Sequence, residues 1–476
     1  MLLDDDQCYR ALRTHDARFD GRFFVGVSTT RIYCRPVCAA RTPNRTHCSF
    51  FPSAAAAEAG GYRPCLRCRP ELAPGYASVD ASRRLAQSAA SMIDDGHLTD
   101  ARLPAIAASL GVTDRHLRRV FQEEFGVAPI DYAQTQRLLL AKRLLTDTDL
   151  PVLDVALSSG FASLRRFNHL IRTRYRMTPA EMRRKSPARA PADRLAFDLG
   201  YRPPYDWDAM LAFLERRAIA GVEAVGKHAY HRTVHIGSRS GWISVKPSKR
   251  RCALRVTVSS SLAGSLPHVL GRVKQLFDLA CRPDEIASVL GELGHANPGL
   301  RVPGAIDGFE IAVRAILGQQ VTVRAAATIA ARFAHAFGEP LATAHPALTR
   351  LFPSAAAIAV LDPAAIAALG IIATRARAIV ALATEVAMGR IRLVPTADID
   401  ATLLALRGVR GVGPWTAQYI AMRALAWPDA FPHPDVAVLK ALHAGTPAAA
   451  LAHAERWRPW RAYAVLHLWK SLEKTP

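Results

Sequence analysis

Four cysteines near the start of the chain form two close pairs. Three residues separate Cys34 from Cys38, two separate Cys65 from Cys68, and 26 residues lie between the pairs. Two such pairs on turns can place four thiolates around one Zn²⁺ at about 2.3 Å, and this crowding argues for a metal rather than for disulfides. Cys48 fits neither pair and is interpreted as a bystander. The spacing predicts a four-cysteine zinc site and leaves open whether the metal is structural or reactive.

A second set of residues with chemical potential lies near the other end of the chain. The sequence GVGPWTA predicts a turn between two short helices, where Gly411 and Gly413 let backbone N–H groups approach a phosphate. Twenty residues after Trp415, Asp435 follows a Pro-bounded turn and opens another helix. A carboxylate at this place either caps the helix or stabilises a developing positive charge.

Two helix-turn-helix patterns follow one another in the helical segment after the cysteines. Gly111 and Gly160 predict the two turns, and Thr113 or Asp114 in the first unit and Ser163 in the second are expected to cap the helices that follow. Such helices enter successive major grooves of DNA. The candidate contact residues are Arg115, Arg118, Arg119, Arg165, Arg166 and Asn168. The pattern assigns none of them to a base rather than a phosphate, and a bundle with solvated arginines is the alternative.

The composition of the chain shows a large excess of positive charge. The 476 residues carry a net charge of +22, with a pI near 10.2. The excess is +10 in residues 1–190 and +12 in the remainder. A basic surface spread over several domains favours a polyanionic partner. The alternative is that the charge excess only keeps the protein soluble. The acidic N-terminus and the lack of a long apolar run predict a soluble protein in the cytoplasm, associated with the nucleoid.

Periodicity predicts a multidomain, mainly α chain. The expected order is a small zinc-bound α+β domain, a helical DNA binder, a Pro- and Ala-rich linker, an α+β domain with an antiparallel sheet, and an all-α domain. The boundaries that we assign are 1–76, 77–184, 185–193, 194–281 and 282–476.

The first two segments resemble known families. FFVGVSTTRIYCRPVC and GYRPCLRCRPE resemble the N-terminal zinc domain of the Ada type. That resemblance implies that Cys34 is both a zinc ligand and the acceptor of a methyl group from a DNA methylphosphotriester, in an irreversible reaction. The repeated pattern ending in FNHLIRTRYRMTP resembles the AraC-type DNA-binding domain.

The C-terminal half resembles the helix-hairpin-helix glycosylases, with the AlkA type of 3-methyladenine DNA glycosylase as the nearest match. FEIAVRAILGQQVTVRAAATIAARF, GVGPWTA and RPWRAYAVLHLWK support this resemblance. It implies that Asp435 is catalytic and that Trp415, Tyr419 and Trp469 form the base pocket, where aromatic faces would attract a cationic base. The alternative is that these rings pack in the core, as most aromatic residues on helices do. Relatives that also cut the DNA backbone carry a lysine where this chain has Trp415, so the resemblance implies hydrolysis without lyase activity.

Two positions depart from the family pattern. Arg410 stands where a proline usually precedes the first glycine of the hairpin, and Gln320 stands where some relatives insert an apolar residue into DNA. Gln320 is a candidate for that inserted residue. The backbone carbonyls around Arg407, Val409 and Val412 are candidates to hold a monovalent cation beside a DNA phosphate.

These features predict a DNA alkylation response and repair protein. It would join a zinc methyl acceptor and transcription activator to a monofunctional glycosylase, with double-stranded DNA and RNA polymerase as partners and a monomeric state. The PCHR motif of an O6-methylguanine methyltransferase is absent. The rival hypothesis is a regulator without enzymatic activity, in which zinc is structural and the C-terminal half adds DNA affinity. An RNA-modifying enzyme is disfavoured because two major-groove readers suit B-form DNA.

Overall fold

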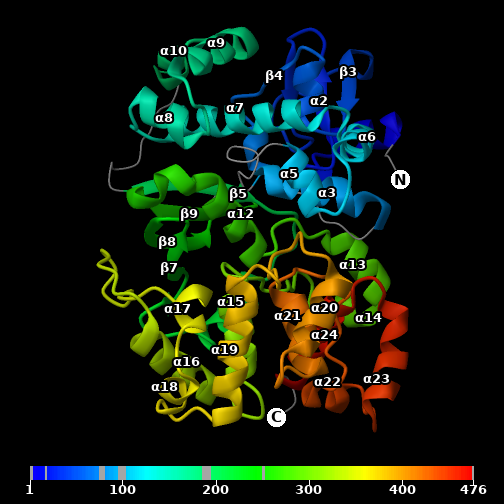
Figure 1. Cartoon of the computed structure of the whole chain (residues 1–476). Coiled ribbons are helices and arrows are strands. Elements are labelled where there is room, and N and C mark those ends of the chain that lie inside the picture. Colours follow the sequence, from blue (N-terminus) through cyan, green and yellow to red (C-terminus); the bar gives the residue numbers. More distant parts are fainter. Residues whose placement is uncertain are drawn as a thin grey trace. The chain divides into compact units, whose positions relative to one another are not determined.

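The computed structural model describes residues 4–16, 19–73, 81–94, 103–184, 194–248 and 252–473 (Figure 1). The chain divides into two compact units. Unit 1 comprises residues 1–203, 247–274 and 279–281, and unit 2 comprises residues 204–246, 275–278 and 282–476. The linker expected at 185–193 lies outside the described residues.

Unit 1 begins with a four-stranded sheet in the order β3-β1-β2-β4. Strand β1 is antiparallel to β2 and β3, whereas β2 is parallel to β4. Tyr33 pairs with Pro64, so the two chain segments that carry the cysteine pairs leave the sheet side by side. The elements are α1 (Asp5–Arg13), β1 (Phe24–Val27), β2 (Ile32–Cys34), η2 (Arg45–His47), β3 (Cys48–Phe51), α2 (Ala54–Ala59), β4 (Arg63–Pro64) and η3 (Pro70–Leu72).

The helical segment of unit 1 contains both predicted helix-turn-helix patterns. Gly111 and Gly160 have φ of +71° and +80° in the two turns, a region that glycine adopts without strain. The side chains of Thr113 and Ser163 accept hydrogen bonds from backbone N–H groups in the first turns of α6 and α9, so Thr113 rather than Asp114 is the first cap. The helices are α3 (Ala81–Asp94), α5 (Leu103–Ser109), α6 (Asp114–Phe125), α7 (Pro129–Asp147), α8 (Val152–Ser158), α9 (Leu164–Tyr175) and α10 (Pro179–Arg184).

Apolar residues at four-residue steps hold these helices together. Leu117, Phe121 and Phe125 of α6 are buried against α3 and α7, and Phe167 and Ile171 are buried on α9. The opposite faces of α6 and α9 are left to polar and basic side chains, as expected for amphipathic helices.

The remainder of unit 1 contains an antiparallel strand pair. Strand β5 (Arg194–Gly200) pairs with β9 (Ala253–Ser259) along its whole length. The chain continues through η4 (Ser260–Ser265) and α12 (Leu266–Leu276). Most residues of both strands are buried, and the pairing agrees with the antiparallel sheet expected for this stretch.

Unit 2 combines three antiparallel strands with a large set of helices. Strand β7 (Tyr230–Ile236) lies between β6 (Glu223–Val225) and β8 (Arg239–Pro247). The helices are α11 (Trp207–Glu215), α13 (Pro283–Leu290), α14 (Glu292–His295), α15 (Gly308–Leu317), α16 (Val323–Phe337), α17 (Ala355–Ala359), α18 (Pro363–Ala367), α19 (Ala373–Ala387), α20 (Ile399–Gly408), α21 (Pro414–Arg423), α22 (Val436–Ala441), α23 (Pro447–Ala454), η5 (Glu455–Trp457) and α24 (Arg461–Glu473).

Helix α15 is the centre of the helical part of unit 2. Nearly all of its side chains are buried, and it packs against α19 and α21. Asp307 begins the helix by accepting hydrogen bonds from Phe309 N and Glu310 N. The buried helix fixes the start of the loop at 318–322, which faces the hairpin between α20 and α21.

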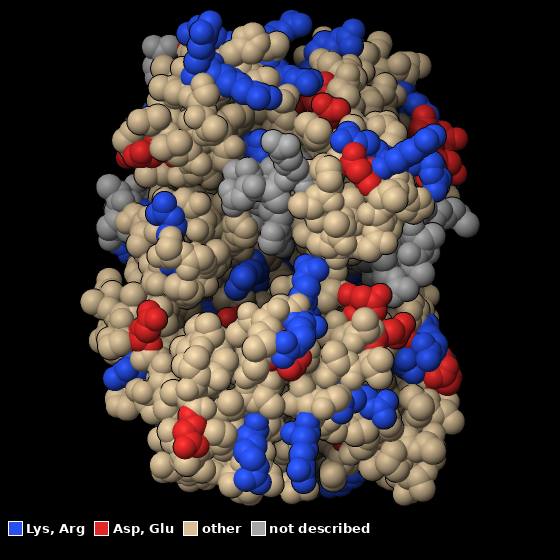
Figure 2. Space-filling view, in the orientation of Figure 1, with Lys and Arg blue, Asp and Glu red and all other residues tan. Residues whose placement is uncertain are grey.

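Charge is distributed over both units. On the face drawn in Figure 2, Lys and Arg side chains appear over many elements rather than in one tail. This agrees with the similar charge excess of the two parts of the sequence. Among the helices of the described part, none has the length and apolar character needed to cross a membrane.

Candidate functional sites

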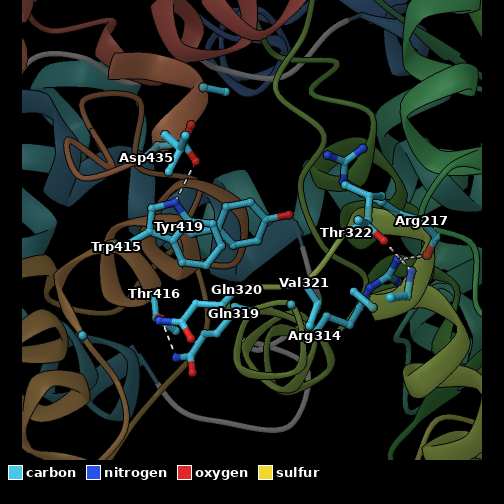
Figure 3. A pocket seen from close by; sticks show the side chains of 18 of the residues that line it. Arg217, Arg314, Gln319, Gln320, Val321, Thr322, Trp415, Thr416, Tyr419 and Asp435 are labelled. Atoms are coloured by element: carbon cyan, nitrogen blue, oxygen red, sulfur yellow. Dashed lines mark hydrogen bonds between the residues drawn. The ribbon is translucent and has the colours of Figure 1, made fainter. Parts of the chain in front are cut away.

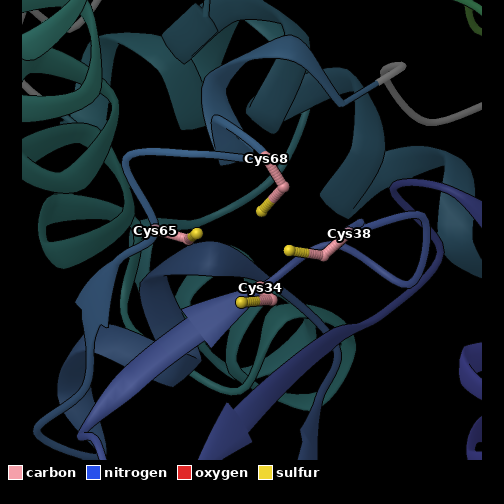
Figure 4. A group of neighbouring side chains, drawn as sticks. All are labelled: Cys34, Cys38, Cys65 and Cys68. Carbon is pink, nitrogen blue, oxygen red and sulfur yellow. The ribbon is translucent and has the colours of Figure 1, made fainter. Parts of the chain in front are cut away.

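The four predicted cysteines come together at the open end of the first sheet. Cys34 ends β2, and Cys65 follows β4, where its N–H donates to Tyr33 O at 3.0 Å. Cys38 and Cys68 lie in the turns that follow, and all four sulfur atoms lie within 4.8 Å of one another (Figure 4). The parallel pairing of β2 with β4 therefore assembles the cluster. Cys48 does not belong to it, as expected.

The cluster fits zinc. A tetrahedron with Zn–S bonds of about 2.3 Å has sulfur–sulfur edges of about 3.8 Å, which the observed spread accommodates. Backbone N–H groups of Arg35 and Arg67 donate to Cys68 Sγ and Cys65 Sγ, both at 3.4 Å, and such donors stabilise thiolates. Hydrogen bonds among the four side chains raise the pKa of Cys34 and Cys68 and lower the pKa of Cys38 and Cys65.

A buried ion pair supports the metal loop. Arg35, which directly follows Cys34, forms a salt bridge with Asp20, and its Nη1 donates to Cys68 O at 3.1 Å. Both charged side chains are buried. Sequence reasoning missed this contact, because nothing in the pattern around Asp20 relates it to Arg35.

The six predicted DNA-contact residues lie on two separate helices. On α6, Arg115 is exposed, Arg118 pairs with Asp114 at 3.0 Å, and Arg119 pairs with Glu123 at 2.8 Å. Exposed pairs of this kind are weak and can open to meet a phosphate. On α9 the three residues occupy the first turn and the one after it, with two exposed and one half-buried: Arg165, Arg166 and Asn168.

The predicted C-terminal residues line one cavity of about 1630 Å³ in unit 2 (Figure 3). It lies between the loop at 318–322, the hairpin and the starts of α16 and α22. The sequence-predicted residues found in its wall are Gln320, Gly411, Gly413, Trp415, Tyr419, Asp435 and Trp469. The polar and charged wall residues that sequence reasoning missed include Arg217, Arg314, Gln319, Arg375, Thr416 and Glu473.

Asp435 is held from three directions. Its Oδ2 accepts a hydrogen bond from Trp415 Nε1 at 2.8 Å, and its Oδ1 accepts from Trp469 Nε1 at 3.1 Å and from Val438 N at 2.9 Å. The residue thus caps α22 and also faces the cavity with a fixed orientation (Figure 3). The cap on α22 is thus confirmed, and the role of Asp435 toward a developing positive charge stays a prediction.

The aromatic residues form a continuous wall beside Asp435. Trp415 and Tyr419 are stacked, with ring centroids 5.2 Å apart and planes at 14°, and Tyr419 lies 6.5 Å from Trp469. Burial opposes ionisation of the Tyr419 phenol, but the nearby cations Arg423, Arg217 and Arg314 outweigh it and lower the pKa of Tyr419. Because all three rings border the cavity, they are available to a flat ligand.

The hairpin turn presents backbone to solvent. Gly411 has φ of +98°, and an added Cβ there would lie 3.0 Å from Ala378 Cβ, so the turn requires glycine. Gly413 has open space where a side chain would be. Val412 N donates to Val409 O at 3.0 Å and closes the turn. The geometry leaves room for a phosphate at the start of α21, where the helix dipole favours an anion.

The adjacent residues Gln319 and Gln320 differ in their contacts and exposure. Gln319 Nε2 donates to Gly411 O and Thr416 Oγ1, both at 2.9 Å, and ties the loop to the hairpin. Gln320 is exposed at the rim of the cavity and has φ of +54°, an unusual conformation for a residue other than glycine. The tie made by Gln319 holds Gln320 in this position.

Family models match four segments of the chain. They describe the metal-binding domain of Ada (residues 7–71), a helix-turn-helix domain (106–185), the AlkA N-terminal domain (196–307) and the HhH-GPD superfamily of base excision DNA repair proteins (313–450). The fold and the two sites therefore define a DNA repair protein with a base-excision domain and an Ada-type metal-binding domain.

Whole-chain relatives narrow this class. A probable bifunctional transcriptional activator/DNA repair enzyme AlkA from Mycobacterium tuberculosis is 38% identical over 99% of this chain and 97% of its own length. DNA-3-methyladenine glycosylase 2 of Escherichia coli is 38% identical over 57% of this chain and 96% of its own length. The chain belongs to the AlkA family of bifunctional transcriptional activator/DNA repair enzymes.

A solved structure supports the fold of the C-terminal half. The 3-methyladenine DNA glycosylase from Archaeoglobus fulgidus matches with a TM-score of 0.51 at 18% identity, over 58% of this chain and 98% of its own length. At this identity the match concerns the fold alone.

Proposed function

We propose that unit 2 releases alkylated bases, of the 3-methyladenine type, from double-stranded DNA by hydrolysis. The observation that carries this proposal is the carboxylate of Asp435, fixed by two indole N–H groups at the wall of an aromatic-lined cavity. A base that is rotated out of the duplex can stack on Trp415 and Tyr419. Its positive charge, produced by alkylation, is attracted to the aromatic faces.

The chemistry follows from the position of the carboxylate. The bond between the sugar C1′ and the base nitrogen breaks, and its electron pair leaves with the base, which becomes neutral. Asp435 stabilises the positive charge that develops on the sugar and orients the water that adds to C1′. Among the described residues no lysine lines the cavity, which supports hydrolysis without cleavage of the DNA backbone.

Replacement of the carboxylate tests this function. We expect Asp435→Asn to keep the cap on α22 and the affinity for DNA, while release of free 3-methyladenine from methylated DNA falls by at least about 100-fold. Chromatography of the released bases and a binding measurement on the same preparation give the two readouts. Unchanged release would remove Asp435 from the mechanism.

For unit 1 we propose that Cys34 accepts the methyl group of a DNA methylphosphotriester. Cys34, Cys38, Cys65 and Cys68 would hold the zinc, which would keep their sulfurs deprotonated at neutral pH. The sulfur of Cys34 attacks the methyl carbon, an S–C bond forms, the O–C bond breaks, and its electron pair stays on the phosphate oxygen. Cys34 and Cys68 are half-buried, whereas Cys38 and Cys65 are buried, so exposure favours the first two and the resemblance to the Ada type selects Cys34.

The same step provides a switch for DNA binding. Conversion of a thiolate to a thioether removes one negative charge from the cluster, so repulsion of ordinary phosphates decreases. The methylated unit then binds promoter DNA through α6 and α9 as a monomer, and activates transcription through RNA polymerase. No group in the described cluster takes the methyl back, so each chain reacts once.

Peptide mapping by mass spectrometry locates the acceptor. After incubation of the full chain with methylated DNA, we expect the mass of one methyl group on the peptide with Cys34 and none on the peptide with Cys65 and Cys68. Cys48→Ser serves as the control because Cys48 is buried outside the cluster. A methyl group on any other cysteine contradicts the assignment.

A further inference from the structure

Arg217 brings a cation with unused donors to the wall of the same cavity. It follows α11, and its guanidinium carbon lies 3.7 Å from the centroid of the Phe213 ring. Its Nη1 donates to Phe213 O at 3.3 Å, and it forms no ion pair with any described residue. Burial and the neighbouring arginines lower the pKa of Arg217 to about 10, so the side chain is still cationic at neutral pH.

Arg314 and Arg423, which lie near Arg217, already have acceptors for their donors. Arg314 donates to Glu223 and Glu310, both at 2.9 Å, and its Nη2 donates to Arg217 O. Arg423 donates to Tyr419 OH at 2.7 Å and to two backbone carbonyls. Arg375 also lines the cavity, where its Nη2 donates to Gln319 O and so holds the loop at 318–322. Beside the Tyr419 ring, Arg217 therefore has most of its five donors available to a ligand.

Figure 3 shows where these donors point. The Arg217 guanidinium extends into the open part of the cavity, on the side away from Asp435, and the Tyr419 ring lies between the two. In the proposed glycosylase, Asp435 would thus face the sugar and Arg217 the far edge of a flipped base. A guanidinium donates hydrogen bonds and accepts none, so it pairs with a carbonyl oxygen and is left unpaired by an amino group.

Building on the proposed glycosylase function, we propose that Arg217 is a specificity-determining residue. It donates to an acceptor on the far edge of the flipped base and favours alkylated purines with a carbonyl oxygen at C6 over those with an amino group. It also orients a cationic base, because the charged methylated edge must turn away from the guanidinium toward the aromatic wall.

The ratio of two bases released from one DNA sample tests this role. Methylated DNA contains 3-methylguanine, with a carbonyl at C6, and 3-methyladenine, with an amino group there. We expect Arg217→Met to lower the ratio of their release rates by about tenfold, as a site built to donate hydrogen bonds loses its preference. Because both bases come from one reaction, the ratio does not depend on the amount of active enzyme.

Arg390→Met is the control. Arg390 is exposed and pairs with Glu385 at 2.6 Å, and neither residue lines the cavity, so its removal should leave the ratio unchanged. If Arg217→Met fails to fold, Arg217→Lys takes its place in the test. It keeps the positive charge and loses the planar fork of donors, so the ratio of release rates should fall for this variant as well. An unchanged ratio in an active Arg217 variant, or an equal fall in both rates, overturns the proposal. If the wild type releases neither base, the proposed function itself fails, and this inference fails with it.

Discussion

At the scale of single residues, Asp435 caps a helix and is the carboxylate that we propose as catalytic. The helix cap could be predicted from the Pro-bounded turn and the apolar run that follows, and the resemblance implied catalysis. The two indole donors could not be predicted, because Trp415 and Trp469 approach the carboxylate only through the packing of α21, α22 and α24. These contacts matter because they restrict the carboxylate to one orientation.

The indole of Trp469 provides the first test at this scale. Trp469→Phe keeps an aromatic ring in the cavity and removes the donor to Asp435 Oδ1. A hydrogen bond to a charged group contributes about 1.5–3 kcal/mol, so we expect the single-turnover rate of base release to fall by about 10- to 100-fold.

Tyr463→Phe is the control for this substitution. Tyr463 lies on the same helix and donates to Asp278 Oδ2 at 2.8 Å, outside the cavity wall. Loss of this hydroxyl should lower stability and leave the rate unchanged. A normal rate in Trp469→Phe would show that the orientation of Asp435 does not depend on this donor.

At the scale of elements, the periodic and capped helices were the most predictable. The two helix-turn-helix patterns follow from turn glycines and from Thr113 and Ser163, all of which act within a few residues of chain. The cysteine cluster was also predictable, because the spacing of the four cysteines in the sequence is nearly sufficient to identify a metal site. Contacts between elements distant in sequence were not, and Glu58 is the clearest case: an acid in the alanine-rich helix α2 shows no pattern, yet it is fully buried.

Glu58 makes the stability of unit 1 depend on pH. It accepts hydrogen bonds from Tyr33 OH at 3.0 Å, Thr135 Oγ1 at 3.2 Å and Tyr175 OH at 3.4 Å, and so joins β2, α7 and α9. Burial raises the pKa of Glu58 from 4.5 to about 7 despite these donors. The folded state therefore binds more protons than the unfolded state between these values. Stability is expected to fall by up to about 3 kcal/mol as the pH rises from 4.5 to 7.

Unfolding of Glu58→Gln between pH 4.5 and 8 measures this contribution. The amide cannot ionise, so the variant should lose that part of the pH dependence and equal or exceed the wild type in stability near pH 8. Glu123→Gln is the control, because Glu123 is exposed and pairs only with Arg119. Equal pH dependence in wild type and Glu58→Gln would mean that Glu58 is ionised in the folded state throughout this range.

At the scale of the whole molecule, the sequence predicts that the excess of positive charge favours a polyanionic partner. Lys and Arg side chains occur in both units. The two sites lie in different units: the cysteine cluster is in unit 1 and the cavity is in unit 2. What composition could not predict is the division of the chain, since residues 247–274 belong to unit 1 although residues on both sides belong to unit 2. We therefore expect each site to work independently of the other, although one chain carries both.

Removal of zinc tests that independence. Among the described residues, no cysteine or histidine lines the cavity, and unit 2 has its own helical core around α15. Chelation should therefore abolish methyl transfer to Cys34 and destabilise the first sheet, because a structural zinc site contributes directly to folding. Release of 3-methyladenine by the same sample should stay within about twofold of the untreated protein.

Metal analysis should give one zinc per chain before treatment, and restored zinc should restore methyl transfer. A parallel loss of both activities on chelation would show that the metal supports the whole chain rather than unit 1 alone.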